Sequence, residues 1–280
     1  MKSTGEIMKI AVTSDNHFDV NRLDVSETIK AQADYLANEN VEIYLIAGDL
    51  FNDFGKSLAY VRSLQAELGS QTLVKFIAGN HDMVQGVTFA ELESTIDVSY
   101  MHNQFLDIPG TNWRLIGNNG WYDYGFADNL PDKTIANFET WKRAYWIDGA
   151  IQQTMTDGER MDLVLDESTK QFKMAEKAHK RVLYYTHFVP RRDYIRYAPE
   201  GNVWNMANAY MGSARLGKLL EKFKTEIVVF GHMHIHPKPK KFSETVYYDQ
   251  AVGYHNKRIN EWQHNTFLEE WQARLAYFEL

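Results

Sequence analysis

Side chains that can bind metal ions follow five apolar runs of this 280-residue sequence, at the point where each run ends. Aspartate, asparagine and histidine supply carboxylate oxygens, amide oxygens and imidazole nitrogens, with which proteins hold divalent transition metals. The chain contains no cysteine, so thiolate ligands are excluded. The pattern predicts a metal site with nitrogen and oxygen ligands. The five stretches are Ser14-Asp15-Asn16-His17, Gly48-Asp49, Gly79-Asn80-His81-Asp82, Thr186-His187 and Gly231-His232-Met233-His234.

The apolar runs before these stretches have the composition of buried β-strands. Residues 73–78 are one example, and Gly79 after them lets the backbone turn where the strand ends. Residues 24–37 and 58–68 place apolar side chains at helical spacing between the first three runs. This β-α-β-α-β order predicts parallel strands with right-handed crossovers. Because ligands of open α/β sheets bind at the carboxyl ends of such strands, the polar stretches are expected to meet there.

More strands are predicted beyond this segment. Residues 105–116 hold two short apolar runs around Pro-Gly-Thr-Asn and predict an antiparallel hairpin at a sheet edge. Residues 181–186 are expected to return to the sheet, and residues 227–230 are predicted to form the last strand that leads into a polar stretch. Residues 246–248 and 275–278 are assigned to a second sheet.

Taken as a set, the five polar stretches resemble the signature of the calcineurin-like metallophosphoesterase superfamily. The resemblance extends from about Met8 to about Asp249. It implies an α/β fold, a four-layer α/β/β/α sandwich, and a two-metal site that cleaves phosphoester bonds. Asn52 departs from the pattern, because many members have aspartate three residues after the metal-bridging aspartate. The whole chain, residues 1–280, is assigned to a single metallophosphoesterase domain.

The ligand types divide into two sets around one shared carboxylate. Asp49 has two oxygens and can bridge two metals, which then lie roughly 3.5–4 Å apart. The expected cofactors are two divalent transition-metal ions. Manganese, iron or zinc is preferred, and nickel and cobalt also accept imidazole and carboxylate ligands. The resemblance assigns the same positions. The first set is Asp15, His17 and His234, and the second set is Asn80, His187 and His232.

Two residues of the third stretch are predicted to act in catalysis. Bound metals lower the pKa of a bridging water, and the resulting hydroxide attacks phosphorus in line with the leaving group. His81 is not a ligand in the superfamily pattern and is expected to give a proton to the leaving alkoxide. Asp82 is expected to orient the His81 ring and to favour the imidazolium.

Residues 120–180 are interpreted as a mostly helical insertion that covers the carboxyl edge of the sheet like a cap. Trp121 and Tyr122 lie in a glycine-rich stretch at its start and are candidate substrate contacts. Trp141 and Trp146 stand at helical spacing and are expected in the core of the insertion itself. The insertion is expected to narrow the cleft to a pocket for a small substrate.

Two arginines after the fourth stretch are further candidates for substrate binding. Arg191 and Arg192 follow His187 closely, and either guanidinium could bind a substrate phosphate in a bidentate manner. The alternative is a solvated pair on the surface.

The charge of the chain disfavours long nucleic acid as a substrate. The formal net charge is −7, whereas proteins that hold nucleic acid through its phosphates need a basic face. The expected substrate is therefore a small-molecule phosphomonoester or phosphodiester. A nuclease of the same superfamily and a non-catalytic scaffold that binds a protein partner are the alternatives. A scaffold should have lost ligands, and here every ligand type is in place.

The sequence offers no feature that indicates a membrane or an export route. No apolar run approaches the roughly 18 residues of a membrane span. Residues 1–7 lack the apolar core of a signal peptide. With no cysteine in the chain, these observations predict a cytoplasmic protein.

Overall fold

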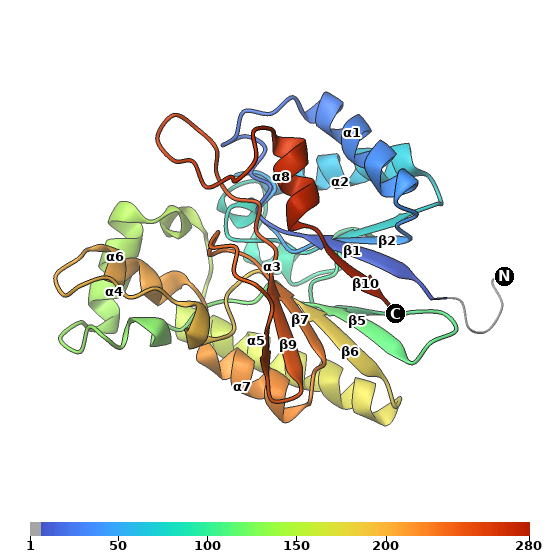
Figure 1. The fold of residues 1–280 in the computed structure, drawn as a ribbon. Helices are drawn as coiled ribbons and strands as arrows, with labels where there is room; N and C mark the ends of the chain where they lie inside the picture. The colour runs from blue at the N-terminus through green and yellow to red at the C-terminus, as the bar shows by residue number, and fades with distance from the viewer. Residues whose placement is uncertain (1–6) are drawn as a thin grey trace.

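The computed structural model describes residues 7–280, and two β-sheets lie face to face between two layers of helices (Figure 1). This arrangement is the predicted four-layer α/β/β/α sandwich. The prediction for the amino terminus falls on residues 1–7, of which residues 1–6 lie outside the described part. None of the helices within residues 7–280 combines the length and apolar character needed to cross a membrane.

The first sheet has four strands in the order β10-β1-β2-β3. β1, β2 and β3 are parallel, as the β-α-β-α-β pattern predicts, and β10 runs antiparallel to β1. Three helices cover the outer face of this sheet (Figure 1). The elements are β1 (Lys9–Thr13), α1 (Val25–Asn38), β2 (Ile43–Ile46), α2 (Phe54–Leu68), β3 (Leu73–Phe76), α8 (Phe267–Arg274) and β10 (Ala276–Glu279).

The second sheet has six strands in the order β4-β5-β6-β7-β9-β8. β5, β6, β7 and β9 are parallel, and the antiparallel strands β4 and β8 form the two edges. The predicted hairpin at a sheet edge is confirmed by β4 and β5. The elements are β4 (Gln104–Asp107), β5 (Trp113–Gly117), α5 (Asp157–Lys177), β6 (Arg181–Tyr185), α7 (Ala214–Lys222), β7 (Ile227–Phe230), β8 (Lys240–Phe242) and β9 (Thr245–Asp249).

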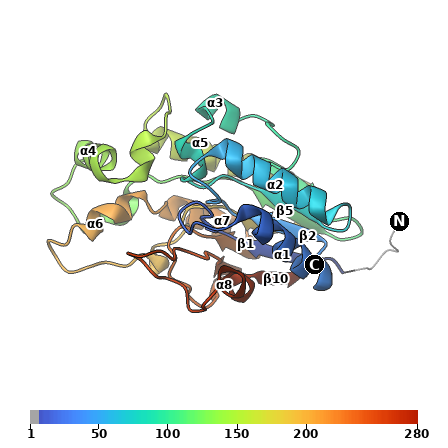
Figure 2. The same ribbon diagram turned by 90° about the horizontal axis from the view of Figure 1, so that it is seen from above.

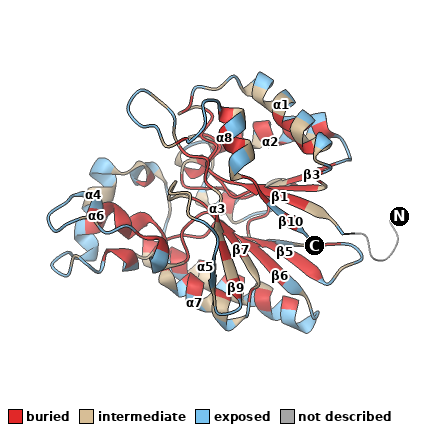
Figure 3. Ribbon diagram, in the orientation of Figure 1, coloured by how far each residue is buried: buried red, intermediate tan, exposed pale blue. Residues whose placement is uncertain are grey.

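Alternation along the strands builds three apolar interfaces. Val12, Leu45 and Leu183 are buried in one cluster, which fills the space between the two sheets. Neighbouring residues such as Ile46 and Tyr184 point the other way, into the core beneath the helices. The central strands are accordingly buried along their length (Figure 3). Strands buried on both faces explain why the sequence shows apolar runs there, with little polar alternation.

The assignment of strands to sheets differs from the prediction in two places. β6 and β7 belong to the second sheet, and β10 completes the first sheet beside β1. The predictions that residues 181–186 return to the first sheet and that residues 275–278 join the second are wrong. Short apolar runs carry no information on their pairing partner, which tertiary packing decides.

A cap covers the carboxyl ends of the strands, and its composition differs from the predicted insertion of residues 120–180. α5 is a crossover helix between the parallel strands β5 and β6, and it lies in the outer layer beside α7 (Figures 1 and 2). Two separate chain segments form the cap beyond the strand ends. Its elements are α4 (Ile135–Tyr145), η3 (Ile147–Ala150), α6 (Trp204–Ala207) and η5 (Asn208–Tyr210). The remaining short elements are η1 (Asp82–Val84), α3 (Phe89–Leu92), η2 (Gly125–Ala127) and η4 (Arg192–Tyr194).

Candidate metal centre

The five polar stretches meet where β1, β2 and β3 of one sheet and β6 and β7 of the other end. Backbone hydrogen bonds connect the loops: the Asp15 amide donates to the Gly48 carbonyl at 2.9 Å. Across the sheets, the His232 amide donates to Asp15 Oδ2 at 2.9 Å. The sandwich therefore brings residues from both ends of the sequence into one compact site.

The first predicted ligand set forms a tight group of donor atoms. His234 Nε2 lies 2.9 Å from Asp15 Oδ1 and 3.2 Å from His17 Nε2. His17 Nε2 lies 3.6 Å from the same oxygen of Asp15. All three side chains can offer one ligand atom within 4.8 Å of one another.

The second predicted set lies beside the first. His187 Nε2 is 3.1 Å from Asn80 Oδ1 and 3.1 Å from His232 Nδ1. Asp49 Oδ2 is 3.3 Å from His187 Nε2 and 3.7 Å from His17 Nε2. A single oxygen of Asp49 therefore faces both groups, while its Oδ1 accepts a hydrogen bond from the His81 amide at 2.9 Å.

The outer nitrogens of three histidines are held by acceptors, and this fixes which nitrogen faces the site. His187 Nδ1 donates to the Ala47 carbonyl at 2.9 Å, and His232 Nε2 lies 3.3 Å from the Tyr210 carbonyl. His234 Nδ1 lies 2.8 Å from Glu261 Oε2. In its neutral form each ring then directs a lone pair inward, and because nearby carboxylates raise the pKa of His187, a metal ion would displace a proton there. Neighbouring lone pairs at about 3 Å repel unless a cation lies between them, so this donor set fits divalent transition metals.

The backbone at the strand ends is unusual. Five of the seven predicted ligands are non-glycine residues in the left-handed region, which costs free energy and concentrates at functional sites. The third stretch must begin with glycine, because a Cβ atom at Gly79 would lie 2.1 Å from Asp49 Oδ1. The five φ values are Asp15 57°, His17 46°, Asp49 59°, His232 73° and His234 48°.

The charges of the site suit cation binding. Burial alone would raise the pKa of Asp49, but the imidazoles of His187 and His81 hold that pKa well below its usual range. Burial would lower the pKa of His187, and the carboxylates of Asp49 and Asp15 instead raise it to about 9. Burial and the nearby His187 lower the pKa of His232 to about 3. The carboxylates are therefore ionised and His232 is neutral.

A family model described as calcineurin-like phosphoesterase matches residues 8–236, which contain all five polar stretches. The chain belongs to the calcineurin-like phosphoesterase family. Metal-dependent hydrolysis of phosphoesters is therefore its general activity. A comparison with curated proteins gives no significant match.

Solved structures share the fold of this phosphoesterase. Phosphopantetheinyl hydrolase from Mycobacterium tuberculosis matches with a TM-score of 0.66 and 14% identity over 98% of this chain and 96% of its own. A dimetal phosphatase from Danio rerio matches with a TM-score of 0.53 and 12% identity over 87% of each chain. At such low identity these likenesses show the fold alone.

His81 of the phosphoesterase has partners that the sequence did not predict. Its Nδ1 lies 2.6 Å from Asn52 Oδ1, and its Nε2 lies 3.0 Å from the Tyr254 hydroxyl. Asn52 is the position at which the sequence departs from the superfamily pattern. A neutral amide oxygen therefore holds the ring where a carboxylate stands in many members. Burial lowers the pKa of His81 to about 3.

Asp82 binds backbone amides, so its predicted role as the partner of the His81 ring is contradicted. Its carboxylate accepts hydrogen bonds from the amides of Asp49 at 2.7 Å and Gly79 at 2.8 Å, and from the Ser57 hydroxyl at 2.5 Å. Burial and the neighbouring Asp49 raise its pKa to about 6. Asp82 thus fastens the loops after β2 and β3 to each other. A carboxylate directly after His81 cannot fold back to its ring while it serves these amides.

A cavity of about 350 Å³ opens over the predicted ligands, and the cap forms much of its wall. Trp146, which was expected in the core of the insertion, lines this cavity. The floor is made by Asp49, Asn80, His81, His232 and His234. The walls are Tyr145, Trp146, Ile147, Trp204, Met211, Met233, Tyr254, Ile259 and Glu261.

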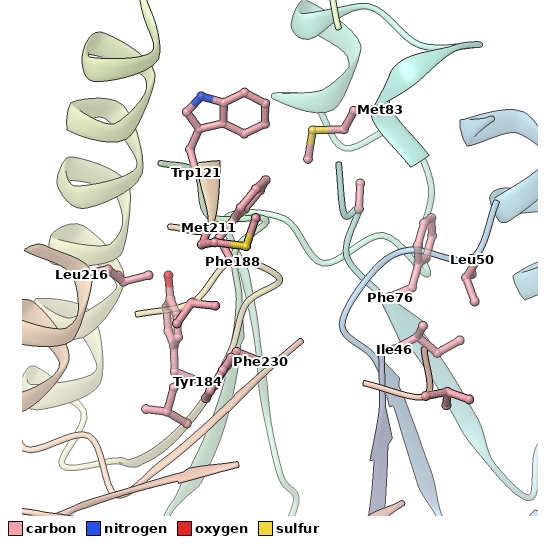
Figure 4. Packing of buried hydrophobic residues seen from close by; sticks show 14 of the residues in the cluster. Ile46, Leu50, Phe76, Met83, Trp121, Tyr184, Phe188, Met211, Leu216 and Phe230 are labelled. Carbon is pink, nitrogen blue, oxygen red and sulfur yellow. The ribbon is translucent and has the colours of Figure 1, made fainter. Parts of the chain in front are cut away.

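Trp121 and Tyr122 lie in the core rather than in this cavity. Both are buried, with exposed fractions of 1% and 0%, and their rings stack with centroids 4.5 Å apart. Figure 4 shows Trp121 among the buried side chains near Phe188. Trp121 Nε1 donates to Asp157 Oδ1 at 2.9 Å. This placement contradicts the predicted contact with substrate, because side chains packed against one another leave no surface for a ligand.

Arg191 and Arg192 also lie outside the residues that line the cavity. Arg191 pairs with Asp193 at 2.8 Å and also with Glu221, and its guanidinium lies over the Phe242 ring. Arg192 pairs with Asp128 at 2.5 Å. Both guanidiniums thus have carboxylate partners, and the alternative of a surface pair agrees with this placement.

Three polar residues around the site were not predicted from the sequence. Asp148 of the cap accepts a hydrogen bond from Asn80 Nδ2 at 2.7 Å. Glu261 binds His234, and Tyr254 binds His81. Tyr254 follows the end of β9, so the rule that polar residues after strands form the site could have found it. No local signal marks Asp148, which lies 68 residues from its partner.

Another group of side chains that could bind a metal lies away from this site, but its hydrogen bonds are those of packed side chains. His102 lies between Glu93 and Glu167. Its Nδ1 accepts a hydrogen bond from the Asn119 amide at 3.0 Å, so the ring proton sits on Nε2, 3.2 Å from Glu93 Oε1. A metal ligand needs a lone pair at that nitrogen. His102 therefore has the hydrogen bonds of a packing residue.

Proposed function

We propose that this phosphoesterase hydrolyses small-molecule phosphomonoesters or phosphodiesters with two divalent transition-metal ions held side by side. The observation that supports it most directly is the position of Asp49 Oδ2, 3.7 Å from His17 Nε2 and 3.3 Å from His187 Nε2. One carboxylate oxygen can therefore serve both groups of donors. Manganese, iron and zinc are the metals that the mixed nitrogen and oxygen set favours.

Seven residues hold the ions in this proposal. When bound, two such ions lower the pKa of water near neutrality and stabilise the charge of the phosphoryl transition state. Asp15, His17 and His234 serve one ion, and Asn80, His187 and His232 serve the other. Asp49 serves both.

His81 is proposed to hold the proton that the leaving alkoxide takes. It lines the cavity floor, and its Nε2 has the Tyr254 hydroxyl as a hydrogen-bond partner. Asn52 Oδ1 accepts the Nδ1 proton and so fixes the ring plane. Because burial lowers the pKa of His81 to about 3, Nε2 carries no proton in the free protein, and the proposed role requires the bound phosphoester anion to raise this pKa. A leaving oxygen that replaces the tyrosine hydroxyl would then take the proton from Nε2.

Metal reconstitution tests the proposal. Chelator-treated protein is loaded with manganese, iron or zinc, and bound metal is measured by elemental analysis beside hydrolysis of 4-nitrophenyl phosphoesters. We expect two ions per chain and turnover that chelator abolishes. Asp49→Ala should weaken both sites, and Asp162→Ala, which changes an exposed aspartate on α5, is the matched control.

Three results would contradict the proposal. Full metal occupancy and activity in Asp49→Ala would show that Asp49 is not a ligand shared by the two ions. A loaded protein that cleaves no phosphoester would favour the non-catalytic scaffold. Degradation of single-stranded DNA with no turnover of small esters would favour the nuclease.

A further inference from the structure

The walls of the cavity above the metal centre are largely apolar. They come from four chain segments: the end of α4, the segment around α6, the loop after β7 and the loop after β9. The rings of Trp146 and Trp204 meet edge to face at an angle of 70°, with centroids 6.4 Å apart. The apolar wall residues are Tyr145, Trp146, Ile147, Trp204, Met211, Met233 and Ile259.

Three of these wall residues are exposed at the mouth of the cavity. Tyr145 is 75% exposed, Trp204 is 51% exposed and Ile259 is 45% exposed. Single exposed apolar residues are ordinary on protein surfaces. Here three of them line one cavity, which also contains the predicted catalytic and metal-binding residues. An apolar group bound at this mouth would remove all three from water.

The charges in the cavity restrict the phosphate that fits. No lysine or arginine is among the described residues that line it, and its wall carries the carboxylate of Glu261. Lys142, on the helix beside the mouth, is paired with the buried Asp157. A dianionic monoester or a polyphosphate would lack cationic side chains for its additional charge. A phosphodiester carries one negative charge, which the bound metals can balance.

We propose that the substrates are monoanionic phosphodiesters in which the ester group that stays on phosphorus is apolar, aromatic or alkyl, and binds against Trp204, Tyr145 and Ile259. This inference rests on the proposed function and narrows its substrate class. In the reaction a water oxygen forms the new bond to phosphorus and releases a proton, and one ester P–O bond breaks. The departing oxygen takes a proton from protonated His81, and the proton released by the water restores it.

A series of 4-nitrophenyl phosphodiesters tests the inference with one constant leaving group. The second ester group is methyl, octyl or 1-naphthyl, and 4-nitrophenyl phosphate is the monoester for comparison. We expect kcat/KM to rise about tenfold from the methyl to the naphthyl diester, the effect of one aromatic stacking partner. Comparison of kcat/KM for the octyl and naphthyl diesters shows whether the site prefers an alkyl or an aromatic group.

Variants at the mouth assign the effect to this surface. Trp204→Ala should reduce the naphthyl-to-methyl ratio of kcat/KM about tenfold, since it removes the exposed ring. Val203→Ala is the matched control, because Val203 is 66% exposed beside Trp204 but does not line the cavity. Its ratio should equal that of the unchanged protein.

The outcomes separate this inference from the proposed function. Equal kcat/KM for the methyl, octyl and naphthyl diesters would overturn it while phosphoesterase activity stands. A monoester turned over faster than every diester would overturn the argument from charge. Loss of the ratio in Val203→Ala as well as Trp204→Ala would place the apolar contact outside the cavity and overturn the assignment. No turnover of any ester by the metal-loaded protein would overturn the proposed function and this inference together.

Discussion

Asp148→Ala tests whether the cap controls the metal centre. Asp148 is in η3, and its Oδ1 accepts a hydrogen bond from Asn80 Nδ2 at 2.7 Å. Both side chains are buried, with exposed fractions of 1% each. This bond directs the amide so that Asn80 Oδ1 faces His187 Nε2 at 3.1 Å. Without the Asp148 carboxylate, the Asn80 amide loses the hydrogen bond that holds its nitrogen on that side, and the amide can rotate.

The magnitude follows from the loss of an outer partner of a ligand. Such changes typically cost about 10–100-fold in metal affinity, or about 1.4–2.7 kcal/mol. The buried amide donor also loses its acceptor, which costs about 1–3 kcal/mol of folding free energy. We therefore expect the affinity of the ion bound by Asn80, His187 and His232 to fall about tenfold or more. The ion bound by Asp15, His17 and His234 should be little affected.

Calorimetric titration of metal-free protein with Mn²⁺ measures both binding steps. Asp148→Asn is the matched control, because its amide oxygen can still accept from Asn80 Nδ2. Circular dichroism before titration establishes that each variant is folded. Unchanged affinity in Asp148→Ala at both steps would refute the reasoning, and so would equal losses in the alanine and asparagine variants.

Three further predictions concern residues around the site and the second sheet. His81→Ala should keep both ions and lose about 10²–10⁴-fold in kcat on alkyl esters, with a smaller loss on 4-nitrophenyl esters that need less proton transfer; loss of metal would make His81 a ligand. Asp82→Ala should lower the free energy of unfolding by about 1–3 kcal/mol for each buried amide left unpaired, as urea unfolding of metal-free protein can measure; a change within 0.5 kcal/mol would contradict its bracing role. Burial raises the pKa of Glu167 to about 7, so the folded protein binds more protons than the unfolded chain between about pH 4.5 and 7 and loses stability as pH rises through that window. Glu167→Gln should flatten this slope in denaturation curves at pH 5 and 8, and an unchanged slope would exclude Glu167 as its origin.

Some of this protein can be predicted from the sequence because the information is local. Each polar stretch directly follows its strand, so the residue types and their place at the carboxyl end are encoded within a few positions. Gly79 was predicted to turn the backbone at the strand end, whereas its close approach to Asp49 appears only in the structure. Apolar runs that alternate with amphipathic helices predict the parallel strands β1, β2 and β3, and the resemblance of the polar stretches to the superfamily implies the four-layer fold.

The partners of those residues could not be read in the same way. Asp82 stands next to His81, yet its carboxylate is used by amides of the loops after β2 and β3. The ring of His81 instead meets Tyr254, which is 173 residues away. The prediction from proximity in the chain therefore paired His81 with the wrong residue. Buried backbone amides need acceptors, and this need decides where the buried carboxylate of Asp82 points.

The sequence by itself determined the ligand types, their order and the family of the fold, since these depend on short stretches and on apolar periodicity. The tertiary structure alone decided the pairing of β6, β7 and β10, the two-segment cap and the apolar wall of the cavity. Trp204 and Trp146 become neighbours only because the segment around α6 packs beside α4. Such contacts form between surfaces that each look ordinary in the sequence, and packing of the whole chain selects which surfaces meet.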